Sequence, residues 1–327
     1  MLLIKYLYDN IYKTFTHDFN RDLLITTYDT IPDYAKSVNI NMKACKCYKF
    51  RWDSTDVELT FYNKNSVKPK DAIALICFYL SILNLYLKKN NKILRIILAP
   101  FDRPKLLPTK MGLPLNPEYV NSGYSTGHHI YIYRKEEMYK VLIHEMIHYY
   151  DIDFKDTRYD GYFKKKYNIR SSKSELRVFE SYTDILAIMF SILAYICFSP
   201  FSKGKTEKQF TELYMRILDS IKTNVIQTVS NIMNHYNCTS FCGFEEETHV
   251  FSYYVCKAAI MFKYKDFLNW LGNDIILSDI RVKEYLELLD SYISNEDFQD
   301  EVKYQLQMPR NKGGESLRMF KYHLKGM

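Results

Sequence analysis

The chain has 327 residues, of which 47% are hydrophobic and 25% are charged, and these values are ordinary for a globular protein. They exclude a disordered chain and a collagen-like or repeat architecture for the protein as a whole. The net charge of +7 is spread along the chain, so we expect a solvated basic surface and no specific nucleic-acid-binding module.

The seven cysteines lie too far apart along the chain for a compact disulfide framework. The amino terminus has only a short apolar run before Lys5, so we expect no signal peptide and an intracellular, cytoplasmic protein with reduced thiols. Two close pairs, Cys45 with Cys47 and Cys238 with Cys242, could hold a structural zinc ion, but neither has the spacing of a common zinc knuckle. Buried free thiols are the simpler prediction.

The first seventy residues are predicted to form a mixed segment of helix and strand. Residues 45–52 and 57–62 alternate in polarity around the turn Asp53-Ser54-Thr55-Asp56, which indicates a β-hairpin. Pro69-Lys70-Asp71 then marks the start of an apolar helix over residues 72–89.

Two strands and a helix are predicted next. Residues 93–99 form a short apolar strand closed by Pro100, and residues 129–133 alternate as a second strand. The proline-rich loop between them carries the turn signal Asn121-Ser122-Gly123. Lys135-Glu136-Glu137 then opens a helix to about Tyr150, with its acids in the first turn, where the helix dipole favours them.

A long helix is predicted over residues 174–198, with Ser174 as its N-cap and Ser199-Pro200 at its end. Its uncharged part, residues 185–198, and the apolar run 72–87 count 14 and 16 residues. Both fall short of the ~20 residues that cross a membrane, so we expect buried helices and no transmembrane segment.

The remaining chain is predicted to be mostly helical. Helices are expected over residues 206–236, 247–263 and 279–304, before a basic tail. The expected organisation is an amino-terminal segment, a catalytic core, a helical subdomain and the tail, over residues 1–70, 71–200, 201–306 and 307–327.

The stretch His144-Glu145-Met146-Ile147-His148 carries the strongest chemical signal. On a helix the two histidines lie on one face, near enough to bind one metal ion. Glu145 lies about 100° round the helix, where it can reach a water on that metal without being a ligand. The apolar run before His144 buries this helix, and buried imidazoles and carboxylates need a metal or polar partners. A purely structural role, with the imidazoles bonded to backbone or tyrosine, is the alternative.

A hydrolytic zinc site takes three protein ligands and leaves a fourth position for water, so a third ligand is expected downstream. Phe154 stands six residues after His148, which excludes the HExxHxxGxxH arrangement. Glu180, 32 residues after His148, is the best candidate because the uncharged run from Ile185 buries its helix. Asp184 follows on the same face, where it can accept a hydrogen bond from the far nitrogen of a ligating histidine. The alternative is a pair of exposed acids.

The pattern His144-Glu145-x-x-His148 followed by Glu180-x-x-x-Asp184 resembles that of the zincin metallopeptidases of the gluzincin type, the group that includes thermolysin. The likeness covers roughly residues 71–200, and Phe179 departs from it, because many relatives have asparagine there. The composition, rich in tyrosine, asparagine and lysine, is similar to that of metallopeptidase-like proteins of large DNA viruses.

This resemblance implies an α+β fold, in which a zincin-like core with a small twisted mixed sheet and an active-site helix precedes a mostly helical part. It implies one Zn²⁺ ion held by His144, His148 and Glu180, with Glu145 as the general base of an endopeptidase. It also implies that the strand over residues 129–133 is the sheet edge that holds the substrate, which makes His129 and Tyr131 candidate substrate contacts.

His249 and Tyr253 are candidates for stabilising the oxyanion, since their i, i+4 spacing places both on one face of a downstream helix. With 30 tyrosines in the chain, however, one tyrosine near a histidine is expected by chance.

Two classes of function stay open. The first is a zinc peptidase that acts on peptide or protein substrates inside a cell or a virus particle. The second is a catalytically retired zincin-fold scaffold protein that recognises a partner. Glu145 favours catalysis, because a retired site needs the metal ligands but not the base. Nucleic-acid binding through the basic tail rests only on charge.

Overall fold

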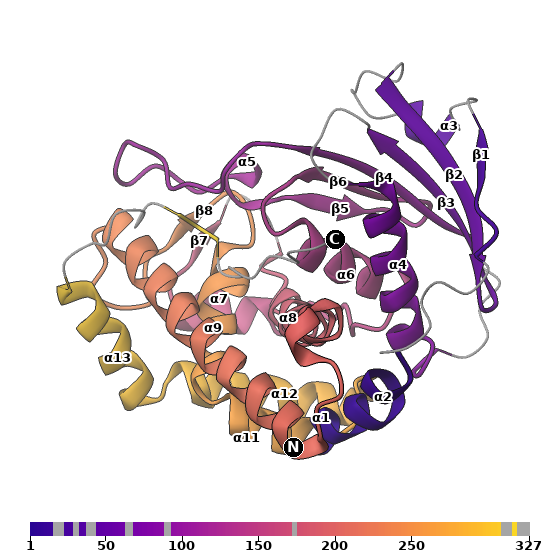
Figure 1. Ribbon diagram of the computed structural model, residues 1–327. Coiled ribbons are helices and arrows are strands. Elements are labelled where there is room, and N and C mark those ends of the chain that lie inside the picture. The colour runs from indigo at the N-terminus through magenta and orange to yellow at the C-terminus, as the bar shows by residue number, and fades with distance from the viewer. Residues whose placement is uncertain are drawn as a thin grey trace.

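A six-stranded sheet lies over a body of helices in the computed structural model, which describes residues 1–15, 23–28, 33–36, 44–62, 68–87, 93–171, 175–308 and 316–318 (Figure 1). The strand order is β1-β2-β3-β4-β6-β5, in which β3, β4 and β6 run parallel and the other neighbours pair antiparallel. The expected mixed sheet with a helical carboxy-terminal part is therefore confirmed. The strands are β1 Thr26–Tyr28, β2 Cys45–Trp52, β3 Thr55–Tyr62, β4 Leu94–Phe101, β5 Gly123–Ser125 and β6 Ile130–Arg134.

The predicted hairpin is present as β2 and β3, paired from Cys45 with Tyr62 to Trp52 with Thr55. Its second strand begins two residues earlier than predicted, because the tight turn needs only Asp53, at φ 49°, and Ser54.

A polar row crosses three strands at one register. Lys49 of β2 pairs with Glu58 of β3 at 3.0 Å, and Arg95 of β4 reaches the same carboxylate at 3.1 Å. The neighbours of Glu58 along β3, Val57 and Leu59, point the other way into the core, so one face of the sheet is apolar.

The edge of the sheet next to the helices is β5, which the sequence did not predict. The prediction that residues 129–133 form the edge is wrong, because β5 pairs outside β6 and places that strand in the interior. The predicted turn signal leads directly into β5. A Cβ atom on Gly123 would lie 2.7 Å from the Ile132 side chain and 2.8 Å from the Tyr131 carbonyl oxygen, so only glycine lets the two strands approach this closely.

Most of the helices lie below the sheet in the view of Figure 1, and helices make up most of the carboxy-terminal part of the described chain. They are α1 Leu2–Leu7, α2 Lys13–Phe15, α3 Asp33–Lys36, α4 Pro69–Leu83, α5 Pro117–Val120, α6 Met138–Tyr149, α7 Asp160–Lys166, α8 Phe179–Phe198, α9 Glu207–His235, α10 Lys257–Phe262, α11 Tyr264–Leu271, α12 Asp279–Ile293 and α13 Glu296–Gln307. Tyr8–Tyr12 and Phe251–Cys256 are π-helical, Pro200–Ser202 is a 3₁₀ turn, and β7 Arg170–Ser171 pairs with β8 Glu245–Glu246.

Several predicted boundaries were wrong for identifiable reasons. The apolar helix α4 ends at Leu83. The Asn84 backbone N–H donates to the Leu80 carbonyl oxygen in the turn that closes the helix. The single helix expected over residues 279–304 is broken into α12 and α13, because the Asn295 side chain caps a new amino terminus. The helix expected over residues 247–263 is π-helical in its middle, and α11 was not predicted.

The first turn expected at residues 135–137 is absent, because Glu137 has a left-handed backbone at φ 58° and α6 starts at Met138. The two glutamates do not lie in a first helical turn but form hydrogen bonds with Lys105. Glu136 accepts from the Lys105 backbone N–H, and Glu137 accepts from the Lys105 ammonium group. Likewise β4 continues through Pro100 to Phe101, with an irregularity after Leu98.

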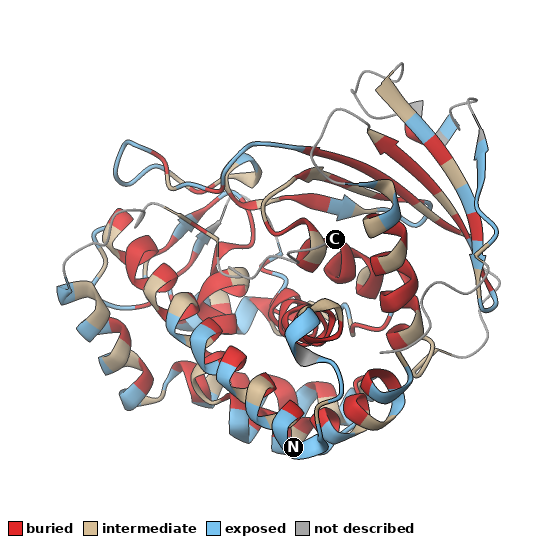
Figure 2. Ribbon diagram, in the orientation of Figure 1, coloured by how far each residue is buried: buried red, intermediate tan, exposed pale blue. Residues whose placement is uncertain are grey.

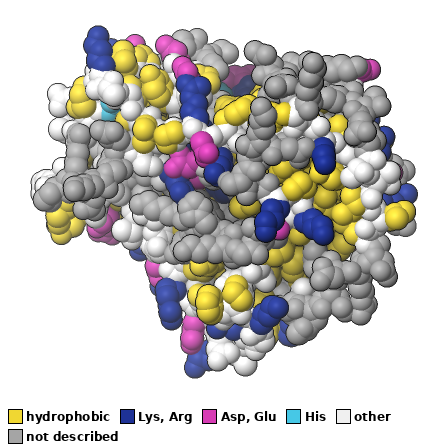
Figure 3. Space-filling view, turned by 45° about the horizontal axis from the view of Figure 1, so that its top comes forward, with side chains coloured by type: hydrophobic (Ala, Val, Ile, Leu, Met, Phe, Trp, Pro, Cys, Tyr) yellow, Lys and Arg dark blue, Asp and Glu magenta, His cyan; other side chains and the backbone are white. Residues whose placement is uncertain are grey.

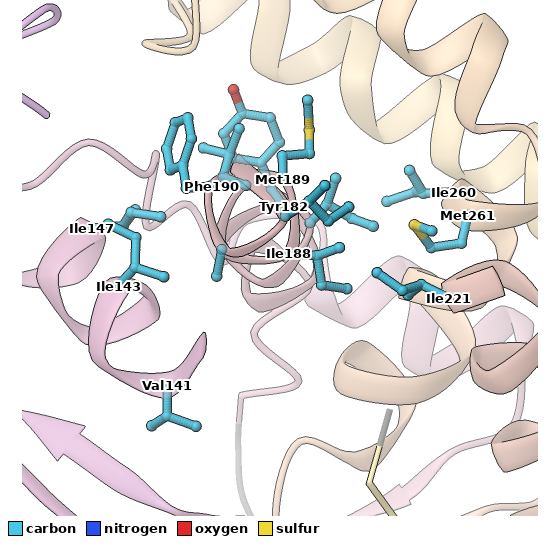
Figure 4. Packing of buried hydrophobic residues seen from close by; sticks show 14 of the residues in the cluster. Val141, Ile143, Ile147, Tyr182, Ile188, Met189, Phe190, Ile221, Ile260 and Met261 are labelled. Carbon is cyan, nitrogen blue, oxygen red and sulfur yellow. The ribbon is translucent and has the colours of Figure 1, made fainter. Parts of the chain in front are cut away.

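Helix α8 is the centre of the helical body. In Figure 4 it is seen end-on, with Ile143 and Ile147 of α6 on one side and Ile260 and Met261 of α10 on the other. In Figure 2 it is buried along almost its whole length. Within the described chain it is the one helix long and apolar enough to cross a membrane, but 89% of its apolar window lies inside the protein. That burial agrees with the expected core helix.

The amino terminus of α8 is stabilised by a distant carboxylate. The predicted N-cap, Ser174, lies outside the described residues, and the helix begins at Phe179 after Val178. Asp160 of α7 accepts hydrogen bonds from the backbone N–H groups of Leu176, Arg177 and Val178, at 2.7–3.1 Å. This contact holds the first turn of α8 in place, where Glu180 lies.

The expected boundary at residue 70 runs through the sheet, since β1, β2 and β3 precede it and pair with the strands that follow. The amino-terminal helices also contact the helical body, for example where the Tyr8 ring lies 5.3 Å from that of Phe210 in α9. Of the predicted basic tail, residues 316–318 are described, and the Leu317 N–H donates to the Lys105 carbonyl oxygen at 2.8 Å.

The buried carboxyl group of Glu246 in β8 should make the thermal stability of the protein depend on pH. It is 1% exposed, and burial raises its pKa from 4.5 to about 8 against the smaller opposing effect of the Phe251 N–H that it accepts. The pKa of Glu246 is thus higher in the folded protein than in the unfolded chain. Its contribution to the free energy of unfolding is therefore complete below about pH 4.5 and is lost as the pH rises through 8. We expect Glu246→Gln to be more stable than the parent at pH 8.5 by on the order of 3 kcal/mol, or about 5 °C in Tm, and nearly equal at pH 5.

Thermal unfolding followed by circular dichroism at the two pH values measures this difference. The exposed neighbour supplies a matched control, since Glu245→Gln should change Tm at neither pH. A Glu246→Gln effect of equal size at pH 5 and pH 8.5 would contradict the assignment.

Candidate metal centre

Helices α6 and α8 bring together the three residues that the sequence predicts as metal ligands. His144 and His148 lie one turn apart on α6, and Glu180 lies in the first turn of α8. His144 Nε2 is 3.1 Å from His148 Nε2, and Glu180 Oε2 is 3.2 and 3.1 Å from these two atoms. His144 and Glu180 are buried, and the His148 side chain is 12% exposed.

This triangle of donor atoms has the size of a metal site. In a tetrahedral zinc site with bonds of about 2.0–2.1 Å, neighbouring ligand atoms lie about 3.3 Å apart. The observed separations of 3.1–3.2 Å are close to that spacing. Within the part of the chain that the structure describes, this is the one group of three such residues whose donor atoms lie within 4.8 Å of one another. These side chains could therefore hold a metal ion.

A second carboxylate orients each histidine. His148 Nδ1 lies 2.7 Å from Asp153 Oδ2, which is a well-formed hydrogen bond. His144 Nδ1 lies 3.2 Å from Asp184 Oδ1, the residue predicted for this role, although the angle at the ring is poor for a hydrogen bond. Both contacts favour the tautomer that turns the Nε2 lone pair toward the centre of the triangle.

Asp153, which contacts His148, is a residue of the candidate site that the sequence analysis did not predict. Helix α6 ends at Tyr149, and the chain reverses through Asp151, whose φ is 53°. This reversal returns Asp153 to the far nitrogen of His148. A carboxylate five residues after the second histidine was the available signal, but nothing local predicts the left-handed residue that turns it inward.

The charges of the cluster are arranged to accept a cation. Burial opposes ionisation of Glu180, but His148 and His144 outweigh burial and hold its pKa well below the usual value. Burial also opposes charge on His148, but Glu180 and Asp153 raise its pKa well above the ordinary value. The buried carboxylates thus stabilise positive charge between the imidazoles, whether a proton or a metal ion carries it.

Glu145 lies beside the triangle and not in it. Its carboxyl group lines a cavity together with His144 and Tyr253. Burial raises its pKa, while the charges of His144 and His148 and a hydrogen bond from Ser125 of β5 lower it. A carboxylate in this place can exchange protons with a molecule in the cavity.

Tyr253 reaches the site from the π-helical segment Phe251–Cys256, with its ring centroid 6.1 Å from that of His144. The ring centroid of His249 lies 6.2 Å from that of Tyr253, so the two predicted residues are adjacent. π-helical turns occur frequently at functional sites, and this one stands where a regular helix was predicted.

The two predicted substrate contacts lie elsewhere. Tyr131 packs against Tyr124 and Tyr133, with ring centroids 5.5 and 5.6 Å away, while its neighbours along β6 face the core. His129 precedes β6, and its Nδ1 lies 3.4 Å from the Thr126 hydroxyl. The structure does not bring either residue to the donor triangle. The cysteines considered for a structural zinc ion form no disulfide in the described chain.

Asp153→Asn should weaken metal binding about 10–100-fold, because an amide cannot hold the His148 tautomer as a carboxylate does. Competition with a chromophoric chelator measures the affinity of purified protein for Zn²⁺. Asp151→Asn is the matched control, since Asp151 is exposed and pairs with Lys155. Equal affinities of the two variants would show that the Asp153 contact does not support the metal.

No protein-family model, curated protein or solved structure matches this chain. Function is therefore inferred from the side chains of the site.

Proposed function

We propose that the protein is a zinc-dependent peptidase with Glu145 as its general base. The observation that carries the proposal is the triangle of two imidazole nitrogens and one carboxylate oxygen, on the 3.1–3.2 Å spacing described above. Two histidines and one glutamate are the donor set of hydrolytic zinc sites, which keep their fourth position for water. The resemblance of the HExxH and ExxxD patterns to gluzincins points to the same chemistry.

A zinc ion in this site would supply Lewis-acid chemistry, because it lowers the pKa of a coordinated water to about 7. Glu145 accepts the proton of the water that attacks the peptide carbonyl carbon. The same carboxyl group then gives this proton to the amine that leaves when the C–N bond breaks. Burial raises the pKa of Glu145, which is the direction that a group that both takes and returns a proton requires.

Tyr253 supplies a hydrogen-bond donor for the oxygen on which negative charge develops. Burial and the charges of Glu180 and Glu145 raise the pKa of Tyr253 well above its ordinary value, so its hydroxyl keeps the proton. Strand β5 is the last strand of the sheet, and Ser125 on it contacts Glu145. An extended peptide can pair with this edge as an added strand beside the base.

A retired scaffold would conserve the metal ligands without needing a base. Glu145, buried in the cavity beside His144, favours the enzyme. Nucleic-acid binding receives no support from the face shown in Figure 3, where Lys and Arg side chains are mixed with acidic and apolar ones among the described residues.

Digestion of a peptide library by zinc-loaded protein, with and without a chelator, tests the proposal. We expect cleavage at neutral pH that is lost on chelation and restored by added Zn²⁺. Stoichiometric zinc without cleavage of any peptide would contradict the peptidase and favour the scaffold.

A further inference from the structure

A small, partly open cavity lies between His144 of the metal centre and Gly123 of β5, with a volume of about 40 Å³. His144, Glu145 and Tyr253 line it beside the donor triangle. Its remaining polar wall contains three lysines from distant parts of the chain: Lys105, Lys140 and Lys257. This volume admits a group of a few heavy atoms and excludes a large side chain.

The three lysines are buried, with exposures of 7%, 6% and 1%. Buried ammonium groups are strongly destabilising unless they are paired. The Lys105 ammonium donates to Glu137 at 3.1 Å, and those of Lys140 and Lys257 both donate to Asp184. Three cations thus share two carboxylates, and the third carboxylate that lines the cavity, that of Glu145, lies next to His144.

The wall has more hydrogen-bond donors than the described bonds use. Each ammonium group has three N–H donors, and in the described chain each has one carboxylate oxygen as its hydrogen-bond partner. The Ser122 hydroxyl also lines the cavity, is buried, and has no hydrogen-bond partner among the described residues. Buried polar groups of proteins are almost always satisfied, so a ligand with acceptor oxygens is expected between them.

The three lysines of the cavity equal its three carboxylates in number, so an anion would be bound by the unused N–H and O–H donors and not by an excess of positive charge. Glu145 also lines the cavity but lies at the metal end, next to His144. Arg134, buried behind the loop that precedes β5, donates to four backbone carbonyl oxygens and adds a further positive charge. Leu317, which is buried, adds an apolar side chain to the lining.

The geometry points to a carboxylate-binding subsite: the cavity takes a carboxylate of the peptide substrate, which Lys105, Lys257 and Ser122 bind beside His144 and Glu145. This inference rests on the proposed peptidase function and names its substrate class. Asp184 joins the subsite to the metal centre, because it contacts Lys140, Lys257 and His144. A short acidic side chain and a free carboxy terminus offer the same chemistry, and both are small enough for the cavity.

The first test is independent of catalysis. Succinate is titrated into zinc-loaded protein by calorimetry, with the parent, Ser122→Ala, Lys105→Met and Lys283→Met compared. Ser122→Ala removes a hydroxyl without breaking a described bond, so this variant should fold, and Lys283 is an exposed control. We expect about tenfold weaker succinate binding in Ser122→Ala and Lys105→Met and no such effect in Lys283→Met, since hydrogen bonds to charged groups are among the stronger ones in proteins. Equal succinate affinity in all four proteins would overturn the subsite.

The second test compares cleavage of matched peptides. One pair carries Asp or Asn next to the scissile bond, and another ends in a free or an amidated carboxy terminus. We expect kcat/KM to favour one charged member about 10–100-fold, and this preference to shrink in Ser122→Ala and Lys105→Met. The favoured pair identifies the source of the carboxylate. Cleavage without any preference for charge would overturn the subsite and leave the peptidase standing. Succinate binding that depends on Ser122 and Lys105, without cleavage of any peptide, would retain the anion site and refute the peptidase.

Discussion

His148→Ala is expected to abolish stoichiometric zinc binding. The substitution removes one of three donors and leaves Glu180 and Asp153 without the imidazole that both contact. If three ligands share a metal-binding free energy of about 10–16 kcal/mol, the loss of one weakens affinity by about 4 kcal/mol, or roughly a thousandfold. Zinc content measured by mass spectrometry after dialysis should fall from one ion per chain to almost none.

His128→Ala is the matched control for this experiment, because His128 is exposed and lies apart from the donor triangle. The control should retain one zinc ion. If His148→Ala also retained one ion at the parental affinity, the triangle of His144, His148 and Glu180 would not be the metal centre.

Glu145→Gln is expected to keep the metal and lose peptidase activity. Glutamine has nearly the same shape but cannot take the proton of the attacking water, and a general base contributes roughly 10²–10⁴ in rate. Because Glu145 is not a member of the donor triangle, zinc content should be unchanged. The measurement is kcat on a cleaved peptide together with zinc content of the same sample.

The exposed residue Glu175 gives a control of the same chemistry, and Glu175→Gln should retain full activity. Turnover of Glu145→Gln close to that of the parent would assign the base to another group. A parallel loss of zinc would instead indicate that Glu145 supports the ligands and does not itself take the proton.

The residues of the site that lie within one helix could be predicted from the sequence alone. Residues four apart on a helix share a face, so the spacing of His144 and His148, and of Glu180 and Asp184, specifies which side chains act together. The alternating residues of β2 and β3 specify the hairpin in the same way, because side chains of a strand alternate between two faces. These predictions depend on one element at a time, and the structure confirms the hairpin and both helices.

What only the tertiary structure decided is how elements distant in the chain meet. The approach of α8 to α6, which closes the triangle, follows from packing of Ile143 and Ile147 against an apolar helix that could have packed in many ways. Asp153 turns inward through the left-handed Asp151, and β5 displaces β6 from the sheet edge through the close approach at Gly123.

The buried lysines are the clearest example of residues whose positions in the fold the sequence pattern does not predict. Lys105 follows the proline of a long loop, Lys140 lies in α6 and Lys257 begins α10, and no periodicity relates them. They are tolerated in the interior because Asp184 and Glu137 lie opposite them, and that pairing exists only when the helices have packed. Helical and strand periods therefore determine which residues of one element act together, whereas the partners of a buried charge depend on packing between elements, which a local pattern does not contain.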